Sequence, residues 1–174
     1  MELKKFRLLF DKDVEQNWLN QMCQNGWALK SFKLGVYTFE RCENGKYIYQ
    51  IDLLPGSGFT PTDPEGYADF MEDIGVEVVC RWFRWIILRK RTEDGPFDIY
   101  TDPDSQIQMY SRIRTMFTFG LGIELCCSAS IWSSLHRSDI LFTLLALLYV
   151  AIIAAFIRVI ITCNRKIKAL EALK

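Results

Sequence analysis

Two long apolar runs near the C-terminal end of the sequence most constrain how this chain can fold. The first covers residues 115–135 and has Glu124 as its only charged side chain, and the second covers residues 140–163 with Arg158 as its only charge. The hydrocarbon core of a bilayer is about 30 Å thick, and a helix of about 20 residues crosses it. Core helices of soluble proteins rarely have apolar stretches of this length, because one face must remain polar. The sequence therefore predicts a C-terminal two-helix transmembrane hairpin over residues 115–163.

Charged residues are concentrated outside these two runs. The chain has 21 basic and 21 acidic residues, of which only six and three, respectively, lie in residues 115–174. Basic residues lie beside the spans at Arg112, Arg114 and the tail 164–174, whereas the turn between the spans has a single Arg offset by an Asp. Because basic flanks stay on the cytoplasmic side, we expect a two-span protein of the bacterial inner membrane with both termini in the cytoplasm. The zero net charge disfavours a nucleic-acid partner.

The residues before the spans contain an internal repeat with a fixed offset of 49 positions. In each copy an acidic start begins a helix, an apolar stripe follows at helical spacing, and a glycine ends the helix because it accepts the left-handed conformation. Strand-like sequence comes next in both copies. The matched pairs are Trp18 with Tyr67, Met22 with Met71, Gly26 with Gly75 and Leu29 with Val78.

Runs of β-branched and aromatic residues predict five strands around these two helices. The fold class expected is therefore α+β: a duplicated β-α-β-β, ferredoxin-like antiparallel sheet with its helices on one face. This domain covers residues 1–102, and a connecting helix over 103–114 runs directly into the first span. The predicted strands are Phe6–Phe10, Val36–Glu40, Tyr47–Ile51, Arg81–Leu88 and Phe97–Tyr100.

The predicted strand 81–88 is apolar on both faces, so both faces need to be covered. The helices cover one of them. The other is covered by a second protomer, a ligand, the connecting helix or the loop over residues 53–66, and the sequence leaves these alternatives open. If a ligand or partner covers it, the aromatic surface consists of Tyr37, Tyr47, Tyr49, Trp82 and Trp85.

The sequence offers little material for catalysis or for a metal centre. The only histidine, His136, lies in the turn between the spans, and no two of the six cysteines have the C-x-x-C spacing of a zinc site. The Gly-rich residues 55–58 lack the Lys of a phosphate-binding loop. The basic residues at 81, 84 and 89–91 are better explained by lipid headgroups than by single-stranded nucleic acid. We therefore expect no catalytic residues, no metal and no cofactor.

Glu124 is the most distinctive single residue, because a carboxylate inside a span is costly and needs a partner helix, water or a counter-charge. It is either an ion or proton site or a structural contact between helices. Small residues recur every four positions about 160° around the helix from Glu124 and predict close helix packing, within the chain or in a homodimer. These residues are Gly122, Cys126, Ser130 and Ser134.

The repeated aromatic and glycine pattern, the segment Phe97–Asp102 and the following helix with Tyr110 and Arg112 resemble one family. It is the bacterial (Firmicutes) membrane-protein family catalogued as domain of unknown function 2812. The resemblance implies a regulatory setting beside a PadR-like transcription regulator, and it implies no catalytic residues.

We therefore expect a non-enzymatic, membrane-anchored cytosolic sensing or protein-interaction module. Its partners would be the lipid bilayer, a second copy, or a PadR-like regulator or other protein. The alternative is a small oligomeric transporter, or transporter subunit, that uses Glu124 in the first span.

Overall fold

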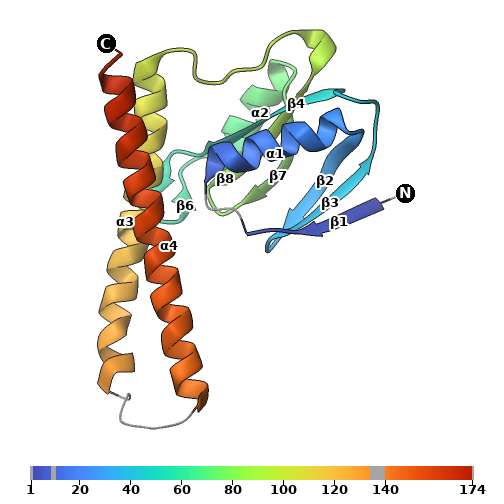
Figure 1. The fold of residues 1–174 in the computed structure, drawn as a ribbon. Coiled ribbons are helices and arrows are strands. Elements are labelled where there is room, and N and C mark those ends of the chain that lie inside the picture. The colour runs from blue at the N-terminus through green and yellow to red at the C-terminus, as the bar shows by residue number, and fades with distance from the viewer. Residues whose placement is uncertain (1, 9–10, 134–139, 174) are drawn as a thin grey trace. The chain divides into compact units, whose positions relative to one another are not determined.

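The computed structural model describes residues 2–8, 11–133 and 140–173 (Figure 1). The chain divides into two compact units, one over residues 1–101 and the other over residues 102–174. Unit 1 contains all the strands and two of the helices, and unit 2 contains the two long helices α3 and α4. The protein is thus a mixed α+β fold with antiparallel sheets and four α-helices among the described residues.

Unit 1 consists of two segments with the same succession of elements. In each segment a strand, a helix and two further strands follow one another, and the second segment has a short two-stranded ribbon inserted before its helix. The first segment comprises β1 (Glu2–Phe6), α1 (Lys12–Gln24), β2 (Trp27–Lys33) and β3 (Val36–Arg41). The second comprises β4 (Tyr47–Leu53), the ribbon β5 (Gly56–Ser57) and β6 (Thr60–Pro61), α2 (Pro64–Asp73), β7 (Glu77–Trp82) and β8 (Trp85–Arg91).

Each segment forms a three-stranded antiparallel sheet in which its last strand is central. The orders are β1-β3-β2 and β4-β8-β7. Both sheets have a register shift in the same place, between Leu29 and Ser31 in the first and between Val78 and Cys80 in the second. These positions differ by 49, which is the offset of the sequence repeat.

Three predicted strands differ from the structure. The first strand is Glu2–Phe6, four residues earlier than predicted, and Leu9 and Phe10 lie outside the described residues. The predicted strand 81–88 is a hairpin, because the chain turns at Phe83, whose φ of 53° lies in the left-handed region. Residues 97–100 form no strand, since their apolar side chains pack onto a core without a ladder partner.

The helix boundaries follow from their capping residues. Asp11 caps α1 by accepting a hydrogen bond from the backbone N–H of Asp13 at 3.0 Å, and Asp63 caps α2 by accepting from Gly66 at 3.0 Å. After α1 the chain passes through Gly26, whose φ of 78° is unfavourable for a side-chain-bearing residue. Asp63 therefore begins its helix as predicted, whereas the first helix is capped by Asp11 and has the predicted Asp13 and Glu15 in its first turn.

Helix α1 also covers the free edge of β4. The side-chain oxygen of Asn20 accepts from the Tyr49 N–H at 2.8 Å, and its amide nitrogen donates to the Tyr49 carbonyl at 3.1 Å. Gln16 Oε1 accepts from the Ile51 N–H at 3.1 Å. The backbone groups at an uncovered strand edge are free to pair with another chain. The side chains of Asn20 and Gln16 bind these groups of β4 in place of a neighbouring strand.

Two cores lie on opposite sides of β8, because its side chains alternate between them. Ile87 and Trp85 belong to the core beneath α1, and Ile86 and Leu88 belong to the core beneath α2. Both apolar faces predicted for residues 81–88 are therefore covered within unit 1, by the first segment on one side and by α2 with Phe97 on the other.

Unit 2 contains α3 (Pro103–Ser133) and α4 (Ile140–Glu171), which lie side by side (Figure 1). Arg114 Nη1 donates to Asn164 Oδ1 at 3.1 Å, and the rings of Phe117 and Phe156 meet edge to face at 5.2 Å. Helix α3 is continuous through the predicted connecting helix and most of the first predicted span. Within the described residues, one helical segment is long and apolar enough to cross a membrane, Thr143–Glu171, in which an 18-residue stretch has a mean hydropathy of 2.8.

Candidate functional site

A carboxylate with no exposed surface lies in the second segment of unit 1. Asp52 on β4 accepts hydrogen bonds from the Tyr67 hydroxyl at 2.8 Å and from the Tyr100 hydroxyl at 2.7 Å. Its Oδ1 also accepts from the backbone N–H of Leu53 at 2.7 Å. A buried carboxylate is costly unless its oxygens are hydrogen-bonded, so these donors make the burial tolerable. The arrangement joins α2 and the end of unit 1 to β4.

The final residues of unit 1 are held to β4 by a second bond. The Gln50 side-chain nitrogen donates to the Phe97 carbonyl at 3.0 Å, and the side chains of Phe97 and Ile99 pack on the core beneath α2. Asp102 then caps α3 by accepting from the Ser105 N–H at 2.8 Å. The segment that leads into α3 is therefore held to β4 by the hydrogen bonds of Gln50 and Asp52, and it ends at Asp102, the cap of α3.

Arg84, in the turn between β7 and β8, is the other buried charged residue among those described. Its guanidinium donates to the Leu54 carbonyl at 2.9 Å and to the Gly58 carbonyl at 2.9 Å, and the residue is 3% exposed. Both acceptors belong to the chain around the β5–β6 ribbon. Arg84 thus holds that ribbon against the turn that follows β7.

Several large apolar side chains are exposed at one end of the strands. We call them the hairpin-tip cluster; its members are Phe6, Leu8, Leu34, Phe59, Trp82 and Phe83. Leu34 is 74% exposed in the β2–β3 turn, and Phe83 is 61% exposed in the β7–β8 turn. The Phe83 ring lies 5.1 Å from that of Trp82 and 6.3 Å from that of Phe59, so three turns contribute to one surface.

The five aromatic residues predicted to form one surface do not lie together in the structure. Tyr37 and Tyr49 are buried in the core beneath α1, where the Tyr49 hydroxyl oxygen accepts a hydrogen bond from the backbone N–H of Leu29 at 2.9 Å. Tyr47 is half-buried, with the Arg89 guanidinium 4.3 Å above its ring, and Trp85 is half-buried against the same core. Trp82 is 41% exposed. The structure therefore places Trp82 in the hairpin-tip cluster and the others in packing roles.

Burial changes the acid–base behaviour of one carboxyl group near Tyr37. Burial raises the pKa of Glu15 above its ordinary value of 4.5, and the hydrogen bond from the Tyr37 hydroxyl at 2.7 Å partly opposes this. The pKa of Tyr37 is raised in turn, first by burial and then by the nearby Glu15 carboxylate. The pair ties α1 to β3.

In the part of the chain that the structure describes, no group of three or more His, Cys, Asp or Glu side chains could hold a metal ion. His136 lies outside the described residues.

A family model of proteins of unknown function, DUF2812, matches residues 11–121. The chain belongs to the DUF2812 family. The match begins at the cap of α1 and ends inside α3, so it includes the Asp52 contacts, both hairpin turns and the start of unit 2. No curated protein and no solved structure matches the chain.

The predicted intramembrane residues lie beyond the DUF2812 match. Glu124 is half-buried on α3, and its backbone carbonyl accepts a hydrogen bond from the Tyr149 hydroxyl of α4. Gly122 and Cys126 are exposed, and a Cβ added at Gly122 would meet nothing within 4 Å. The side chain of Ser130 and all of Ser134 lie outside what the structure describes. Within this DUF2812 chain, the side of α3 that contacts α4 thus includes Glu124 and not Gly122.

Sequence reasoning missed the Asp52 contacts and the hairpin-tip cluster in this DUF2812 chain. A sequence signal existed for Asp52, since an Asp inside the apolar run Ile51–Leu54 predicts a buried polar group that needs donors. The turn at Phe83 had none, because Phe and Arg are not residues that favour tight turns.

Proposed function

We propose that this DUF2812 chain is a membrane-anchored, non-enzymatic interaction or sensing module. In this proposal α4 crosses the bilayer, the apolar part of α3 crosses it a second time, and unit 1 lies in the cytoplasm with both termini. The observation that carries it is the helical segment Thr143–Glu171, in which an 18-residue stretch has a mean hydropathy of 2.8. Its large side chains, including Leu147 at 63% and Val150 at 61% exposure, face away from the protein and would contact lipid.

We further propose that unit 1 is a duplicated β-α-β-β, ferredoxin-like domain. The equal strand orders, the register shifts 49 positions apart and the left-handed residues Leu34 and Phe83, also 49 apart, support a common origin of the two segments. Such a duplication gives two related surfaces on one anchored domain, which suits a module that binds partners.

The contacts of Asp52 give unit 1 a point at which a bound partner would be felt. Tyr67 of α2 and Tyr100 at the end of unit 1 both donate to Asp52 on β4. A partner that displaces β4 or α2 would therefore loosen the end of unit 1.

Membrane fractionation with alkaline carbonate tests the anchor. The full chain should stay with the membranes, because burying the apolar side chains of α4 in lipid is strongly favourable. Replacing Leu147 and Val150 by Arg should release it, since each Arg near the centre of a span costs about 3 kcal/mol. Leu173→Arg, at an exposed residue beyond the apolar segment, is the matched control and should leave the chain in the membrane. Recovery of the unaltered chain in the soluble fraction would contradict the proposal.

Native mass spectrometry of the full chain, extracted in mild detergent from its own cells, tests the interaction role. We expect a second copy or a partner protein to remain bound, and a PadR-like regulator is the partner class that the family resemblance implies. A lone monomer with no bound protein would count against an interaction module.

A further inference from the structure

The hairpin-tip cluster combines exposure with backbone strain. Leu34 and Phe83 have φ values of 47° and 53°, in the left-handed region that Gly or Asn occupies at little cost. Both side chains are nonetheless large, apolar and more than 60% exposed. They occupy equivalent turns, 49 residues apart. Turn geometry does not favour large apolar residues at these two positions, and most of each side chain stays uncovered, which suits contact with an apolar phase.

The cluster is continuous across the elements that form it. The Phe32 ring lies 5.8 Å from the Trp82 ring, which joins the β2–β3 hairpin to the β7–β8 hairpin. A Cβ added at Gly35 would lie 3.1 Å from Phe6 and 3.1 Å from Leu8, so these two side chains lie against the β2–β3 turn. Arg7 N–H donates to the Gly35 carbonyl at 2.8 Å and fixes this arrangement. The exposed apolar groups thus lie on neighbouring turns.

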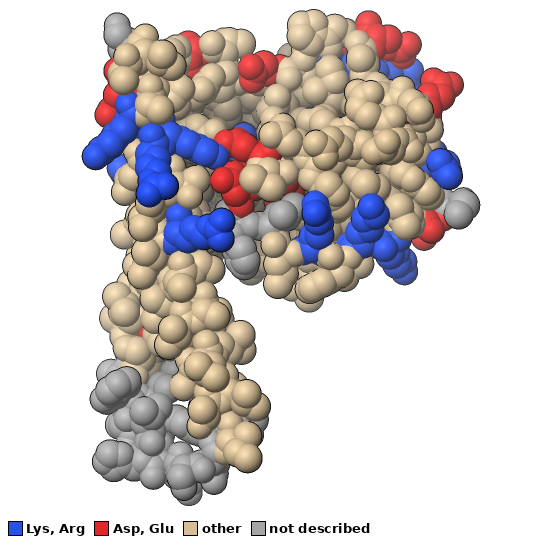
Figure 2. Space-filling view, viewed as in Figure 1, with Lys and Arg blue, Asp and Glu red and all other residues tan. Residues whose placement is uncertain are grey.

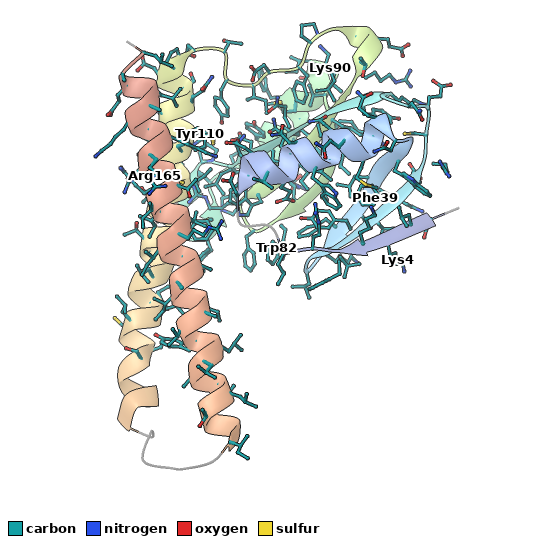
Figure 3. All side chains as sticks on the ribbon, viewed as in Figure 1. Lys4, Phe39, Trp82, Lys90, Tyr110 and Arg165 are labelled. Carbon is teal, nitrogen blue, oxygen red and sulfur yellow. The ribbon has the colours of Figure 1, made fainter. Side chains whose placement is uncertain are left out.

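Basic side chains accompany the cluster. Lys33 precedes Leu34, Arg7 lies between Phe6 and Leu8, and Lys4 lies on the same strand as Phe6; all three are exposed. Figure 2 shows Lys and Arg side chains along the margin of unit 1 on which Figure 3 places Trp82 and Lys4. Apolar and aromatic tips flanked by Lys and Arg match the two layers of a bilayer surface, since the rings enter the interfacial region while the cations meet anionic headgroups.

We propose that the hairpin-tip cluster docks on the surface of an anionic lipid bilayer. This inference rests on the proposed anchor, because α4 keeps unit 1 close to the membrane and makes docking an intramolecular event. A protein partner is the less favoured occupant, since binding hot spots lie in well-packed central pockets, and here the apolar residues are exposed at turns with Lys4 and Lys33 nearby in the sequence. Docking would hold the β2–β3 and β7–β8 turns in the headgroup layer.

Hydrogen–deuterium exchange of the full chain tests this docking. The chain is measured in detergent, in nanodiscs of phosphatidylcholine, and in nanodiscs of phosphatidylcholine with phosphatidylglycerol. In the anionic nanodiscs the backbone amides of residues 32–36 and 81–85 should exchange several-fold more slowly than in detergent. Residues 43–46 and 92–95 are the internal control, because Thr92 bonds to Gly45 and Lys46 at the opposite end of the strands. Their exchange should not change.

Two sets of variants sharpen the test. The double variant Leu34→Asn and Phe83→Asn removes both apolar side chains, so it should abolish the slowing. Asparagine accepts a left-handed backbone, so the turns should keep their conformation and the control segments should stay protected. Phe70→Asn removes an apolar side chain of similar exposure, 58%, from α2 and should leave the slowing intact. Lys4→Gln and Lys33→Gln should each lower the docked-to-undocked ratio about fivefold, because one basic residue near an anionic surface contributes about that factor.

Three results would overturn the docking. The first is equal amide exchange at the tips in detergent and in anionic nanodiscs. The second is a slowing in detergent that grows with protein concentration, because it would assign the surface to a second copy. The third is an equal slowing in zwitterionic nanodiscs. Failure of the anchor is a separate result, seen as a chain that does not co-elute with nanodiscs. Amide exchange at residues 32–36 and 81–85 would then be measured on the same chain with added anionic vesicles. The docking proposal requires the same slowing there.

Discussion

The two β-α-β-β segments of unit 1 have the same strand order but use their equivalent side chains differently. In the first segment, Gln16 and Asn20 of α1 bond to the edge of β4. The equivalent residues of α2, Glu65 and Asp69, are exposed, and Glu65 forms an ion pair with Arg81 at 3.0 Å. The same backbone therefore supports a helix that completes a sheet in one copy and a helix with a solvated face in the other.

The turns of the two segments also use their equivalent side chains differently. Gly35 leaves space for the side chains of Phe6 and Leu8, whereas its equivalent, Arg84, fills the interior and bonds to the ribbon that only the second segment possesses. Trp18 packs edge to face on Tyr37 at 4.8 Å, whereas its equivalent, Tyr67, donates to Asp52. At these two pairs of positions, the first segment uses apolar packing and the second uses buried polar bonds. Four substitutions test this difference.

Arg84→Ala should have the largest effect. It removes two buried charge-assisted hydrogen bonds and leaves the carbonyls of Leu54 and Gly58 without this donor, so unit 1 should lose about 3 kcal/mol of unfolding free energy. Urea unfolding of the full chain in mild detergent, followed by tryptophan fluorescence, measures the loss. Arg81→Ala is the control, because its ion pair is exposed and contributes less than about 1 kcal/mol. Equal losses for both variants would contradict the buried role of Arg84.

Asn20→Asp should cost about 2 kcal/mol, because the carboxylate cannot donate to the Tyr49 carbonyl and places negative charge beside it. Asp69→Asn is the reverse exchange at the equivalent exposed position and should be nearly neutral. The same urea titration compares the two variants. If both are neutral, α1 does not complete the edge of β4.

Tyr67→Phe should cost about 1 kcal/mol, the usual loss for one hydrogen bond, because Asp52 keeps its bonds from Tyr100 and Leu53. Tyr100→Phe should cost a similar amount and, unlike Tyr67→Phe, should speed amide exchange in residues 97–101. Unchanged exchange there would show that Asp52 does not hold the segment that leads into α3.

Glu15→Gln should change the pH dependence of the unfolding free energy more than its magnitude. The pKa of Glu15 is raised by burial, so the folded state binds its proton more tightly than the unfolded state does. Stability from this group is fully present below about pH 4.5 and is lost as the pH rises through the raised pKa. The glutamine variant should lack that loss, and urea midpoints from pH 4 to 8 would measure it. Glu72→Gln, an exposed control on α2, should keep the slope of the unaltered chain.

The helix ends of unit 1 could be predicted because they depend on neighbours in the sequence. Asp63 caps α2, Asp13 and Glu15 lie in the first turn of α1, and Gly26 and Gly75 follow the two helices. The turn at Phe83 could not be predicted, since nothing local favours a left-handed phenylalanine. The long apolar run 81–88 therefore looked like one strand.

The sequence by itself determined the α+β composition and a C-terminal helix apolar enough for a membrane, because each depends on periodicity, capping and hydropathy along the chain. Only the tertiary structure decided that β8 has its two faces in separate cores, that Asn20 completes an edge, and that Leu34 and Phe83 gather at one end. These are contacts between residues far apart in the sequence, and which of them form depends on how the two segments pack together.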